Sequence, residues 1–312
     1  MTNGTLEPAP PVASPPEPRY LLGVLGNQIP YQSVQSLPRR NPLSSNVLLE
    51  KIRAGNVVLG IACMYPASGI IEGGCRNWDF VWIDGQHGQF GYDALLHAVQ
   101  TADATGIETL LRVPGHEDGI IGPMADLSPS AIMVPMVNNA EQAKAIVSSL
   151  RFPPLGQRSY GGRRVIDLHG RDYYRERELM VVAQIETLEA VDNAEAIIGT
   201  EGVDCLFFGP DDMKVRMDIP VNTPPMEHPK LKAAMEKVAA VARSAGKFAG
   251  TVTASPDSVK AGMEMGYQML VGGGDIMFMR LGAAAALEKL RAAAGEQAKA
   301  TKGEAATGVY SG

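Results

Sequence analysis

Eight short apolar runs, separated by helical patterns, constrain the fold of this chain more than any other feature. Each run is continuously apolar and bounded by turn residues, which is typical of strands buried on both faces of a parallel sheet. The runs cover residues 57–63, 80–83, 109–112, 131–135, 180–186, 203–208, 248–252 and 268–271. Helical patterns cover residues 92–105, 140–150, 188–198, 229–245, 255–265 and 275–294. This alternation predicts the α/β class and a (β/α)8 TIM barrel rather than a doubly wound sheet.

The two ends of the chain differ in composition from the barrel pattern. Residues 1–45 are rich in proline and show no sustained helical or strand period, which indicates an extended N-terminal arm. Residues 294–312 are rich in alanine, glycine and lysine, and we expect a flexible tail there. The catalytic barrel is therefore expected to occupy residues 46–293.

Charge and cysteine usage restrict the partners and the compartment. The chain has 312 residues and a formal net charge of −6, whereas binding to nucleic acid or to an anionic membrane calls for a basic face. Three well-separated cysteines, Cys63, Cys75 and Cys205, imply no disulfide framework. No apolar run approaches the roughly 18 residues of a membrane span, and no secretory leader pattern opens the sequence. We expect a cytoplasmic protein with a small-molecule partner, and no nucleic acid or membrane partner.

Polar side chains follow the apolar runs where a barrel places its active site. Barrel enzymes carry their chemistry at the C-terminal ends of the strands. We therefore expect buried charge at this end of the barrel and nowhere else. The candidates here are Asp84, His87, Arg112, Gln184, Glu186 and Asp212.

Glu186 and Asp212 end neighbouring strands and are predicted to converge. Two carboxylates at the mouth of a barrel suit a hard divalent cation, with Mg²⁺ as the first expectation and Mn²⁺ or Co²⁺ as alternatives. Gln184 lies two residues before Glu186, on the same face of the strand, and would line the same pocket. The alternative is that both acids cap the helices that follow them.

The second and third strands end in groups suited to proton transfer and anion binding. Asp84 stands three residues before His87 in a glycine-bracketed turn, so the carboxylate could orient an imidazole that carries protons. The alternative is a capping aspartate beside a histidine that only packs. Arg112 could hold a carboxylate or enolate oxygen, or else form a structural ion pair with Glu108 or Asp118.

Other motifs narrow the chemistry. In the segment Gly209-Pro210-Asp211-Asp212, backbone N–H groups near Pro210 to Asp212 lie where a loop opens toward a helix, which is suited to binding a small carboxylate. No strand ends in a lysine for Schiff-base chemistry, and Lys214 is the one candidate nearby. The sequence has no dinucleotide, P-loop or HExxH motif. The basic segment 156–164 could frame the pocket or form a solvated loop.

Five motifs in this order resemble the HpcH/HpaI family of metal-dependent 2-oxo acid aldolases, which includes 4-hydroxy-2-oxo-acid aldolases and macrophomate synthase. The motifs are Asp79-Phe80-Val81-Trp82-Ile83-Asp84-Gly85-Gln86-His87, Val134-Pro135-Met136-Val137, Pro153-Pro154-Leu155-Gly156-Gln157-Arg158, Gln184-Ile185-Glu186-Thr187 and Phe208-Gly209-Pro210-Asp211-Asp212. The resemblance spans roughly residues 46–293 and implies a homo-oligomer, a trimer or hexamer with an exchanged last helix.

The resemblance also implies roles for the candidate residues. Glu186 and Asp212 would hold the metal, and the Asp211–Asp212 backbone would bind the substrate carboxylate. The catalytic residues would be Asp84 and His87, as the acid/base pair, and Arg112, which would bind the enolate. One departure is that Gln86 precedes His87 where the family commonly has glutamate.

These roles lead to a hypothesis for the reaction. The chain is expected to be a class II aldolase, a carbon–carbon lyase that cleaves a 4-hydroxy-2-oxo acid to pyruvate and an aldehyde through a metal-bound pyruvate enolate. One alternative is an oxaloacetate decarboxylase or a macrophomate-synthase-like enzyme that uses the same enolate to form a carbon–carbon bond. A second alternative, from another class, is a noncatalytic 2-oxo acid binding protein.

Overall fold

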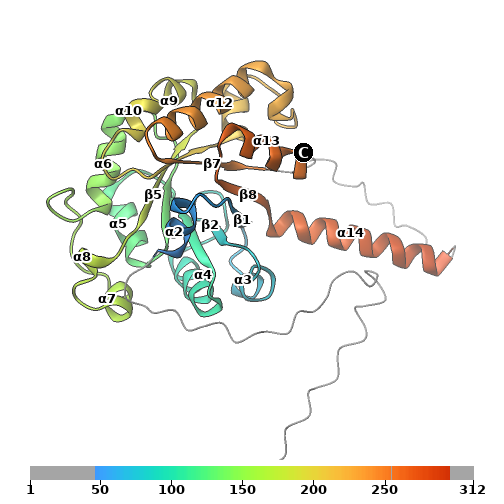
Figure 1. Ribbon diagram of the computed structural model, residues 1–312. Helices are drawn as coiled ribbons and strands as arrows, with labels where there is room; N and C mark the ends of the chain where they lie inside the picture. Colours follow the sequence, from blue (N-terminus) through green and yellow to red (C-terminus); the bar gives the residue numbers. More distant parts are fainter. Residues whose placement is uncertain (1–45, 254, 296–312) are drawn as a thin grey trace, which may run out of the picture. The chain divides into compact units, whose positions relative to one another are not determined.

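The strands form one closed parallel barrel in which each strand pairs with the next along the chain (Figure 1). The computed structural model describes residues 46–253 and 255–295. The last strand pairs with the first and closes the barrel, as the sequence predicts. The strands are β1 (Val58–Cys63), β2 (Phe80–Asp84), β3 (Glu108–Arg112), β4 (Ala131–Val134), β5 (Met180–Ile185), β6 (Cys205–Phe208), β7 (Phe248–Val252) and β8 (Met269–Gly274).

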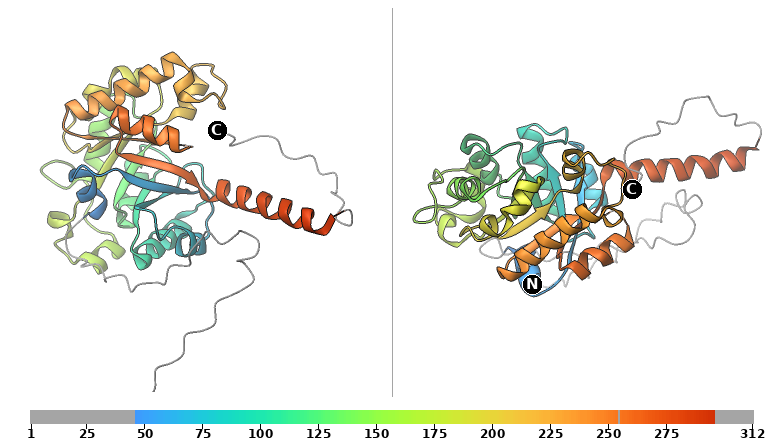
Figure 2. Two further views of the ribbon diagram at one scale, coloured as in Figure 1. Left: turned by 45° about the vertical axis from the view of Figure 1, so that its right-hand side comes forward. Right: turned by 90° about the horizontal axis from the view of Figure 1, so that it is seen from above.

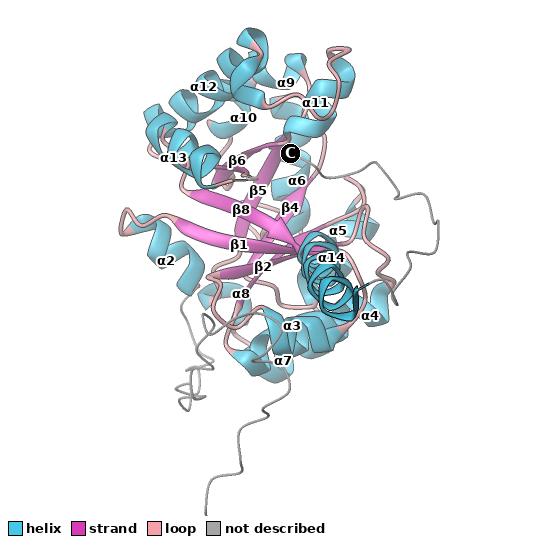
Figure 3. Cartoon of the chain, turned by 90° about the vertical axis from the view of Figure 1, so that its right-hand side faces the viewer, coloured by secondary structure: helices cyan, strands magenta, loops and turns pink. Residues whose placement is uncertain are grey.

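Helices surround the strands in every view (Figures 2 and 3). The predicted helices at 92–105, 140–150 and 275–294 have the expected bounds, whereas the pattern at 188–198 is two helices that meet at Asn193. The helices are α2 (Val47–Arg53), α3 (Ser68–Gly74), α4 (Tyr92–Thr105), α5 (Asp118–Asp126), α6 (Ala140–Leu150), α7 (Arg163–His169), α8 (Tyr173–Glu176), α9 (Leu188–Asp192), α10 (Ala194–Ile198), α11 (Pro210–Arg216), the 3-10 turn η1 (Pro225–Glu227), α12 (Pro229–Ser244), α13 (Pro256–Met265) and α14 (Asp275–Ala294).

Alternate residues of each strand face the barrel interior and the surrounding helices. The inward cluster includes Phe80, Trp82 and Leu110, while their neighbours Val81 and Leu111 belong to the outer cluster under the helices. This two-residue period follows from the pleat of a strand. Because the same period continues to the strand ends, it decides which terminal side chains point into the barrel mouth.

Large and small inward residues pair between neighbouring strands. Gly60 pairs in register with Phe80, and a Cβ at Gly60 would lie 2.2 Å from the Phe80 ring. Gly250 pairs with Phe207 in the same way, and a Cβ at Gly250 would lie 2.5 Å from that ring. A barrel of this size has room for one large side chain per pair, so the glycines make space for the phenylalanines.

The amino-terminal end of the barrel is closed by α2 and a polar network. Leu48, Leu49 and Ile52 of α2 belong to the same cluster as the inward strand residues. Asn46, the N-cap of α2, donates its side-chain amide to the Ser130 carbonyl at 2.6 Å. The helix therefore seals the end of the barrel opposite the strand carboxyl ends.

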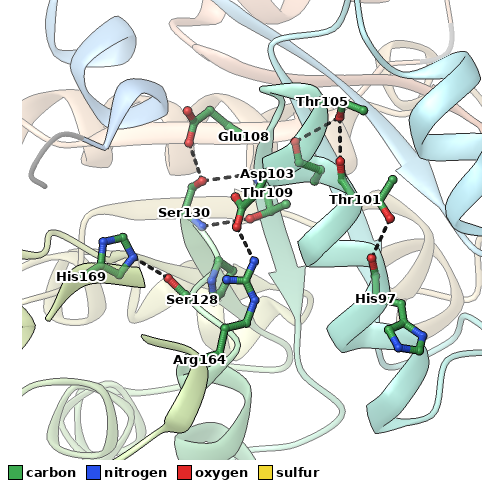
Figure 4. Close-up of polar contacts among 12 residues, drawn as sticks. His97, Thr101, Asp103, Thr105, Glu108, Thr109, Ser128, Ser130, Arg164 and His169 are labelled. Carbon is green, nitrogen blue, oxygen red and sulfur yellow. Dashed lines mark hydrogen bonds and ion pairs between the residues drawn. The ribbon is translucent and has the colours of Figure 1, made fainter. Parts of the chain in front are cut away.

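Buried charge also occurs at this amino-terminal end, so the expectation of charge at the mouth alone was wrong. Glu108 begins β3 and accepts a hydrogen bond from the Ser130 hydroxyl, and Arg164 forms an ion pair with Asp103 at 2.5 Å (Figure 4). Arg158 is buried and pairs with Asp126 at 2.6 Å. These partners come from segments far apart in the sequence, so their pairing could not be read from local patterns.

The described residues divide into two compact units. One ends at Arg280 and contains the whole barrel, and the other contains the helical stretch 281–295. The predicted N-terminal arm and nearly all of the predicted tail lie outside the described residues.

Among the described residues, no helix is both long and apolar enough to cross a membrane. Cys63, Cys75 and Cys205 are buried free thiols.

Candidate active site

Three polar side chains continue the inward rows at the carboxyl ends of the strands. Asp84 follows Phe80 and Trp82 at two-residue spacing, Arg112 follows Leu110, and Gln184 follows Val182. Asp84 and Arg112 are also register partners across β2 and β3. The pleat therefore brings all three into one layer at the barrel mouth, where the sequence predicts them.

Asp84 and Arg112 form a buried two-point ion pair. The Arg112 Nε donates to Asp84 Oδ1 at 2.8 Å, and a terminal nitrogen donates to Oδ2 at 2.5 Å. Their side chains are 1% and 7% exposed, respectively, and the guanidinium lies 4.7 Å above the Trp82 ring. The remaining terminal nitrogen lies 3.5 Å from Gln184 Oε1. The predicted alternatives for Arg112, Glu108 and Asp118, are not its partners.

Asp84 also shapes the loop that carries His87. Its Oδ1 accepts the backbone N–H groups of Gln86 at 3.0 Å and His87 at 3.2 Å. Gly85 and Gly88 of this turn have no room for a side chain. A Cβ at Gly85 would lie 2.6 Å from the Arg112 carbonyl, and one at Gly88 would lie 2.3 Å from the Asp84 carbonyl.

The His87 side chain is exposed, and within the described residues its imidazole makes no hydrogen bond to Asp84. The spacing of the two residues predicts direct orientation of the imidazole by the carboxylate, which the structure does not show. Asp84 instead orders the His87 loop through the backbone.

Glu186 is the most deeply buried acid near Asp212. Its side chain is 2% exposed, and its Oε2 accepts the Met136 backbone N–H at 2.8 Å. The pKa of Glu186 is raised to about 7, above all by burial and in part by the neighbouring Asp212 carboxylate, while the Met136 N–H and Arg112 oppose the rise. The structure thus brings Glu186 and Asp212 together, as their positions after β5 and β6 predict.

The backbone at the end of β6 passes directly over these side chains. A Cβ at Gly209 would lie 2.7 Å from Glu186 Cγ, 2.9 Å from Glu186 Oε1 and 3.2 Å from Gln184 Nε2. Gly209 is also the N-cap of α11, with Pro210 in the first turn. A side chain here would displace Glu186, so glycine at this position is a requirement of the site.

The two acids of α11 have different surroundings. Asp211 is largely exposed and pairs with Lys214 at 2.9 Å, so its carboxylate is committed to that contact. Asp212 faces Glu186 and lies 4.0 Å from the Arg216 guanidinium. Lys214 is buried and donates to the Val221 carbonyl at 2.5 Å. Lys214 therefore ties down the loop after α11 rather than standing free for Schiff-base chemistry.

The donor set fits a hard divalent cation. Two carboxylates in contact, one of them deeply buried, create local negative charge and offer only oxygen ligands. Among residues 46–253 and 255–295, no group of three or more histidine, cysteine or acidic side chains could hold a metal. Sites for Mg²⁺ commonly use one or two carboxylates and leave the other positions to water and substrate.

Several contacts near the site were not predicted by the sequence analysis. Met136 holds a left-handed backbone with φ of 56° and donates to Glu186. His116, in the loop after β3, bonds the Pro135 carbonyl. Trp82 lies under Arg112, and its buried Nε1 has no hydrogen-bond partner in the part of the chain described. A positive φ is not readable from the letters Pro-Met, and these contacts depend on loop conformation.

The basic segment 156–164 does not frame this pocket. It connects α6 to β5, and its arginines Arg158 and Arg164 pair with Asp126 and Asp103, which lie at the ends of α5 and α4. Such a helix-to-strand connection lies at the amino-terminal end of a parallel barrel. The ion pairs of Arg158 and Arg164 brace helices there.

The chain is similar to known proteins in sequence and in structure. The model of a family described as "HpcH/HpaI aldolase/citrate lyase" matches residues 71–280. The chain is 30% identical over 266 residues to a hydroxypyruvate/pyruvate aldolase of Cupriavidus necator, covering 84% of this chain and 95% of that protein. It is 40% identical over 168 residues to a 4-hydroxy-2-oxovalerate aldolase of Novosphingobium aromaticivorans, covering 52% of this chain and 64% of that relative.

The fold agrees with this similarity. A solved HpcH/HpaI aldolase/citrate lyase family protein from Burkholderia cenocepacia J2315 superposes with a TM-score of 0.73 at 25% identity, covering 79% of this chain and 100% of that one. All of the site residues described above lie within the range that the family model matches.

Proposed function

Because the chain belongs to the HpcH/HpaI aldolase/citrate lyase family, we propose that it is a metal-dependent aldolase that cleaves a 4-hydroxy-2-oxo acid to pyruvate and an aldehyde. One observation carries the proposal. The buried Asp84–Arg112 pair with Gln184, and the facing Glu186 and Asp212 carboxylates, are neighbours at one end of the barrel. The barrel mouth would thus combine the fixed positive charge of Arg112 with a site for a divalent metal ion.

Glu186 and Asp212 would hold the divalent cation, for which Mg²⁺ is the first choice and Mn²⁺ and Co²⁺ are alternatives. When bound, the cation supplies a Lewis acid for the keto group of a 2-oxo acid. Met136 binds Glu186 Oε2, and the absence of a side chain at Gly209 leaves room beside Oε1. Gln184 and the backbone of Gly209, Pro210, Asp211 and Asp212 line the pocket for the substrate carboxylate.

Arg112 would stabilise the negative oxygen that develops as the carbon–carbon bond breaks. Asp84 engages two of its nitrogens and fixes the plane of the guanidinium, while the third lies near Gln184. A guanidinium oriented before the reaction stabilises developing charge without reorganisation. The cation–π contact with Trp82 supports the same orientation from below.

His87 would carry the proton of the 4-hydroxyl group. Its side chain is exposed at the mouth, and its loop is held by the backbone contacts to Asp84. A histidine exchanges protons near neutral pH, which suits general base catalysis. In this assignment Asp84 acts twice, as the partner of Arg112 and as the anchor of the His87 loop.

One observation favours a second candidate function. Gln86 carries an amide where the resembling family commonly has a carboxylate, and its buried Oε1 has no hydrogen-bond partner among the described residues. An amide cannot take up the proton that a carboxylate would, so proton transfer beside His87 is altered. Decarboxylation of oxaloacetate, or carbon–carbon bond formation from the same enolate in the manner of macrophomate synthase, needs no 4-hydroxyl proton.

A metal-resolved substrate screen tests these functions. The full chain is stripped of metal, reloaded separately with Mg²⁺, Mn²⁺ or Co²⁺, and incubated with 4-hydroxy-2-oxo acids and with oxaloacetate. Pyruvate together with an aldehyde supports the aldolase, whereas release of CO₂ without an aldehyde supports the decarboxylase. The metal-free protein and Glu186→Gln serve as controls.

Exchange of the pyruvate methyl protons with deuterated solvent separates either enzyme from a noncatalytic 2-oxo acid binding protein. An enolate-forming enzyme exchanges these protons when metal is present. Binding of pyruvate without exchange would overturn the proposal.

We also propose a homo-oligomer, a trimer or hexamer. Phe278 and Met279, at the start of α14, are exposed within the barrel unit, and exposed apolar side chains of this kind commonly mark subunit contacts. Light scattering coupled to gel filtration measures the mass directly, and a monomer would refute the assignment.

A further inference from the structure

One peptide unit connects His116 to Glu186. The carbonyl of Pro135 bonds the His116 Nε2, and the N–H of Met136, on the same peptide, donates to Glu186 Oε2 at 2.8 Å. A peptide is planar, and in its trans form the carbonyl and the N–H point in opposite directions. Fixing the carbonyl from one side therefore fixes the direction of the N–H on the other.

The conformation of Met136 shows that this peptide is held rather than relaxed. Its φ of 56° lies in the left-handed region, which a residue with a side chain adopts only when surrounding contacts impose it. The next residue, Val137, donates its N–H to the Gln184 carbonyl at 3.1 Å, and the Met136 sulfur accepts from Arg216 at 3.4 Å. His116 supplies the contact on the opposite side.

The acceptor identifies the form of His116. A backbone carbonyl only accepts hydrogen bonds, so the His116 Nε2 must carry a proton and donate. That nitrogen is therefore occupied by the contact and cannot serve as a base for substrate. This argues for an orienting role and against a place for His116 Nε2 in proton transfer.

The two oxygens of Glu186 are divided by this contact. Oε2 receives the Met136 N–H, whereas Oε1 lies beside Gly209, at the start of the helix that carries Asp212. If the peptide turned, Glu186 Oε2 would lose its backbone donor. The orientation of the peptide thus decides the orientation of the carboxylate.

We propose that His116 is a positioning residue that sets the Glu186 carboxylate for metal binding, acting through the Pro135–Met136 peptide. This inference rests on the proposed role of Glu186 as a metal ligand. Groups that orient metal ligands typically contribute between about 10-fold and 100-fold to metal affinity. Because His116 acts through an intervening peptide, the lower end of that range is expected.

Direct measurement of Mn²⁺ affinity tests the proposal. Isothermal titration calorimetry on the metal-stripped full chain compares the wild type with His116→Phe, His116→Ala and His116→Gln. The first two remove the donor, whereas the glutamine amide nitrogen restores a donor at a similar reach. The expected result is a Kd raised about tenfold in the phenylalanine and alanine variants and restored to within about threefold of the wild type by glutamine.

The matched control is His169→Phe. His169 is also half-buried and bonds a neighbour, the Ser128 hydroxyl, at 2.9 Å, but it lies on α7, away from the site. Its variant should bind Mn²⁺ as the wild type does. Equal weakening by His169→Phe and His116→Phe, or an unchanged Kd in both donor-free variants, would overturn the proposal. Circular dichroism of each variant establishes that it is folded. Because two variants lack the donor, the test still holds if one of them does not fold.

Kinetics add a readout that a general structural defect would not give. The Mn²⁺ concentration that gives half-maximal activity should rise in His116→Phe by more than the maximal rate falls. A lower rate at every metal concentration with an unchanged Mn²⁺ Kd would place His116 elsewhere in the reaction.

If wild type and Glu186→Gln bind Mn²⁺ equally, the metal site itself fails. If Glu186→Gln loses binding while the His116 variants keep it, the positioning role alone fails.

Discussion

Replacing Glu186 by glutamine should stabilise the metal-free protein at neutral and higher pH. Burial raises the pKa of Glu186 from 4.5 to about 7, because the interior disfavours the charged carboxylate and Asp212 adds a second negative charge. The folded state therefore binds this proton more tightly than the unfolded state. The proton bound to Glu186 stabilises the folded state fully below the pKa that Glu186 has in the unfolded state. This stabilisation is lost as the pH rises through the pKa that Glu186 has in the folded state.

The magnitude follows from the two pKa values. A rise from 4.5 to about 7 corresponds to about 3 kcal/mol of unfolding free energy, lost by the wild type across that pH window. Glutamine at position 186 cannot ionise, yet its carbonyl oxygen can still accept the Met136 N–H. The variant should gain about 3 kcal/mol over the wild type between about pH 4.5 and pH 8.

Urea unfolding followed by circular dichroism, with a chelator present, measures this gain. Glu189→Gln, which removes an exposed carboxylate from α9, is the control for the loss of one charge. Saturating Mn²⁺ should make the wild type more stable than Glu186→Gln, since the wild type then gains binding energy that the variant lacks. A stability difference that stays constant with pH, or that Glu189→Gln reproduces, would refute the reasoning about Glu186.

Two further variants test the groups around Glu186. Arg112→Ala should lower turnover by orders of magnitude and destabilise the fold by about 3–5 kcal/mol, because it leaves the Asp84 charge buried without a partner. Adding Asp84→Asn to this variant should restore much of the stability but not the activity. Denaturation and steady-state assays measure the two effects. Gly209→Ala should destabilise the protein by about 1–3 kcal/mol and weaken Mn²⁺ binding, because the new Cβ meets Glu186. Wild-type metal affinity in Gly209→Ala would contradict the close approach at that position.

The barrel could be predicted from sequence because its signals are local. The strand at 248–252 and the helices at 92–105 and 140–150 have the predicted bounds, since each is a clear apolar run or a helical period of several turns. The helices α3 and α7 were missed, because a stretch of one or two turns shows too little period to be recognised. The helix predicted at 188–198 breaks at Asn193, which caps α9 at its C-terminus.

The site was predictable to the extent that it follows the pleat. Arg112 and Gln184 are inward positions of predicted strands and Asp84 directly follows one, and their meeting follows from the two-residue period and the register. The contact between His116 and Pro135 follows from the path of two loops, which no period specifies. The same holds for the buried Arg158, whose partner on α5 is distant in sequence.

The glycine–phenylalanine pairs inside the barrel restrict how this sequence can vary. Gly60 and Phe80 face each other across β1 and β2, and Gly250 and Phe207 do so across β6 and β7. A larger residue at either glycine becomes acceptable only if the opposite ring shrinks at the same time. Mutant libraries that randomise one strand at a time would therefore find both glycines invariant, whereas libraries that vary facing positions together would recover the exchanged pair.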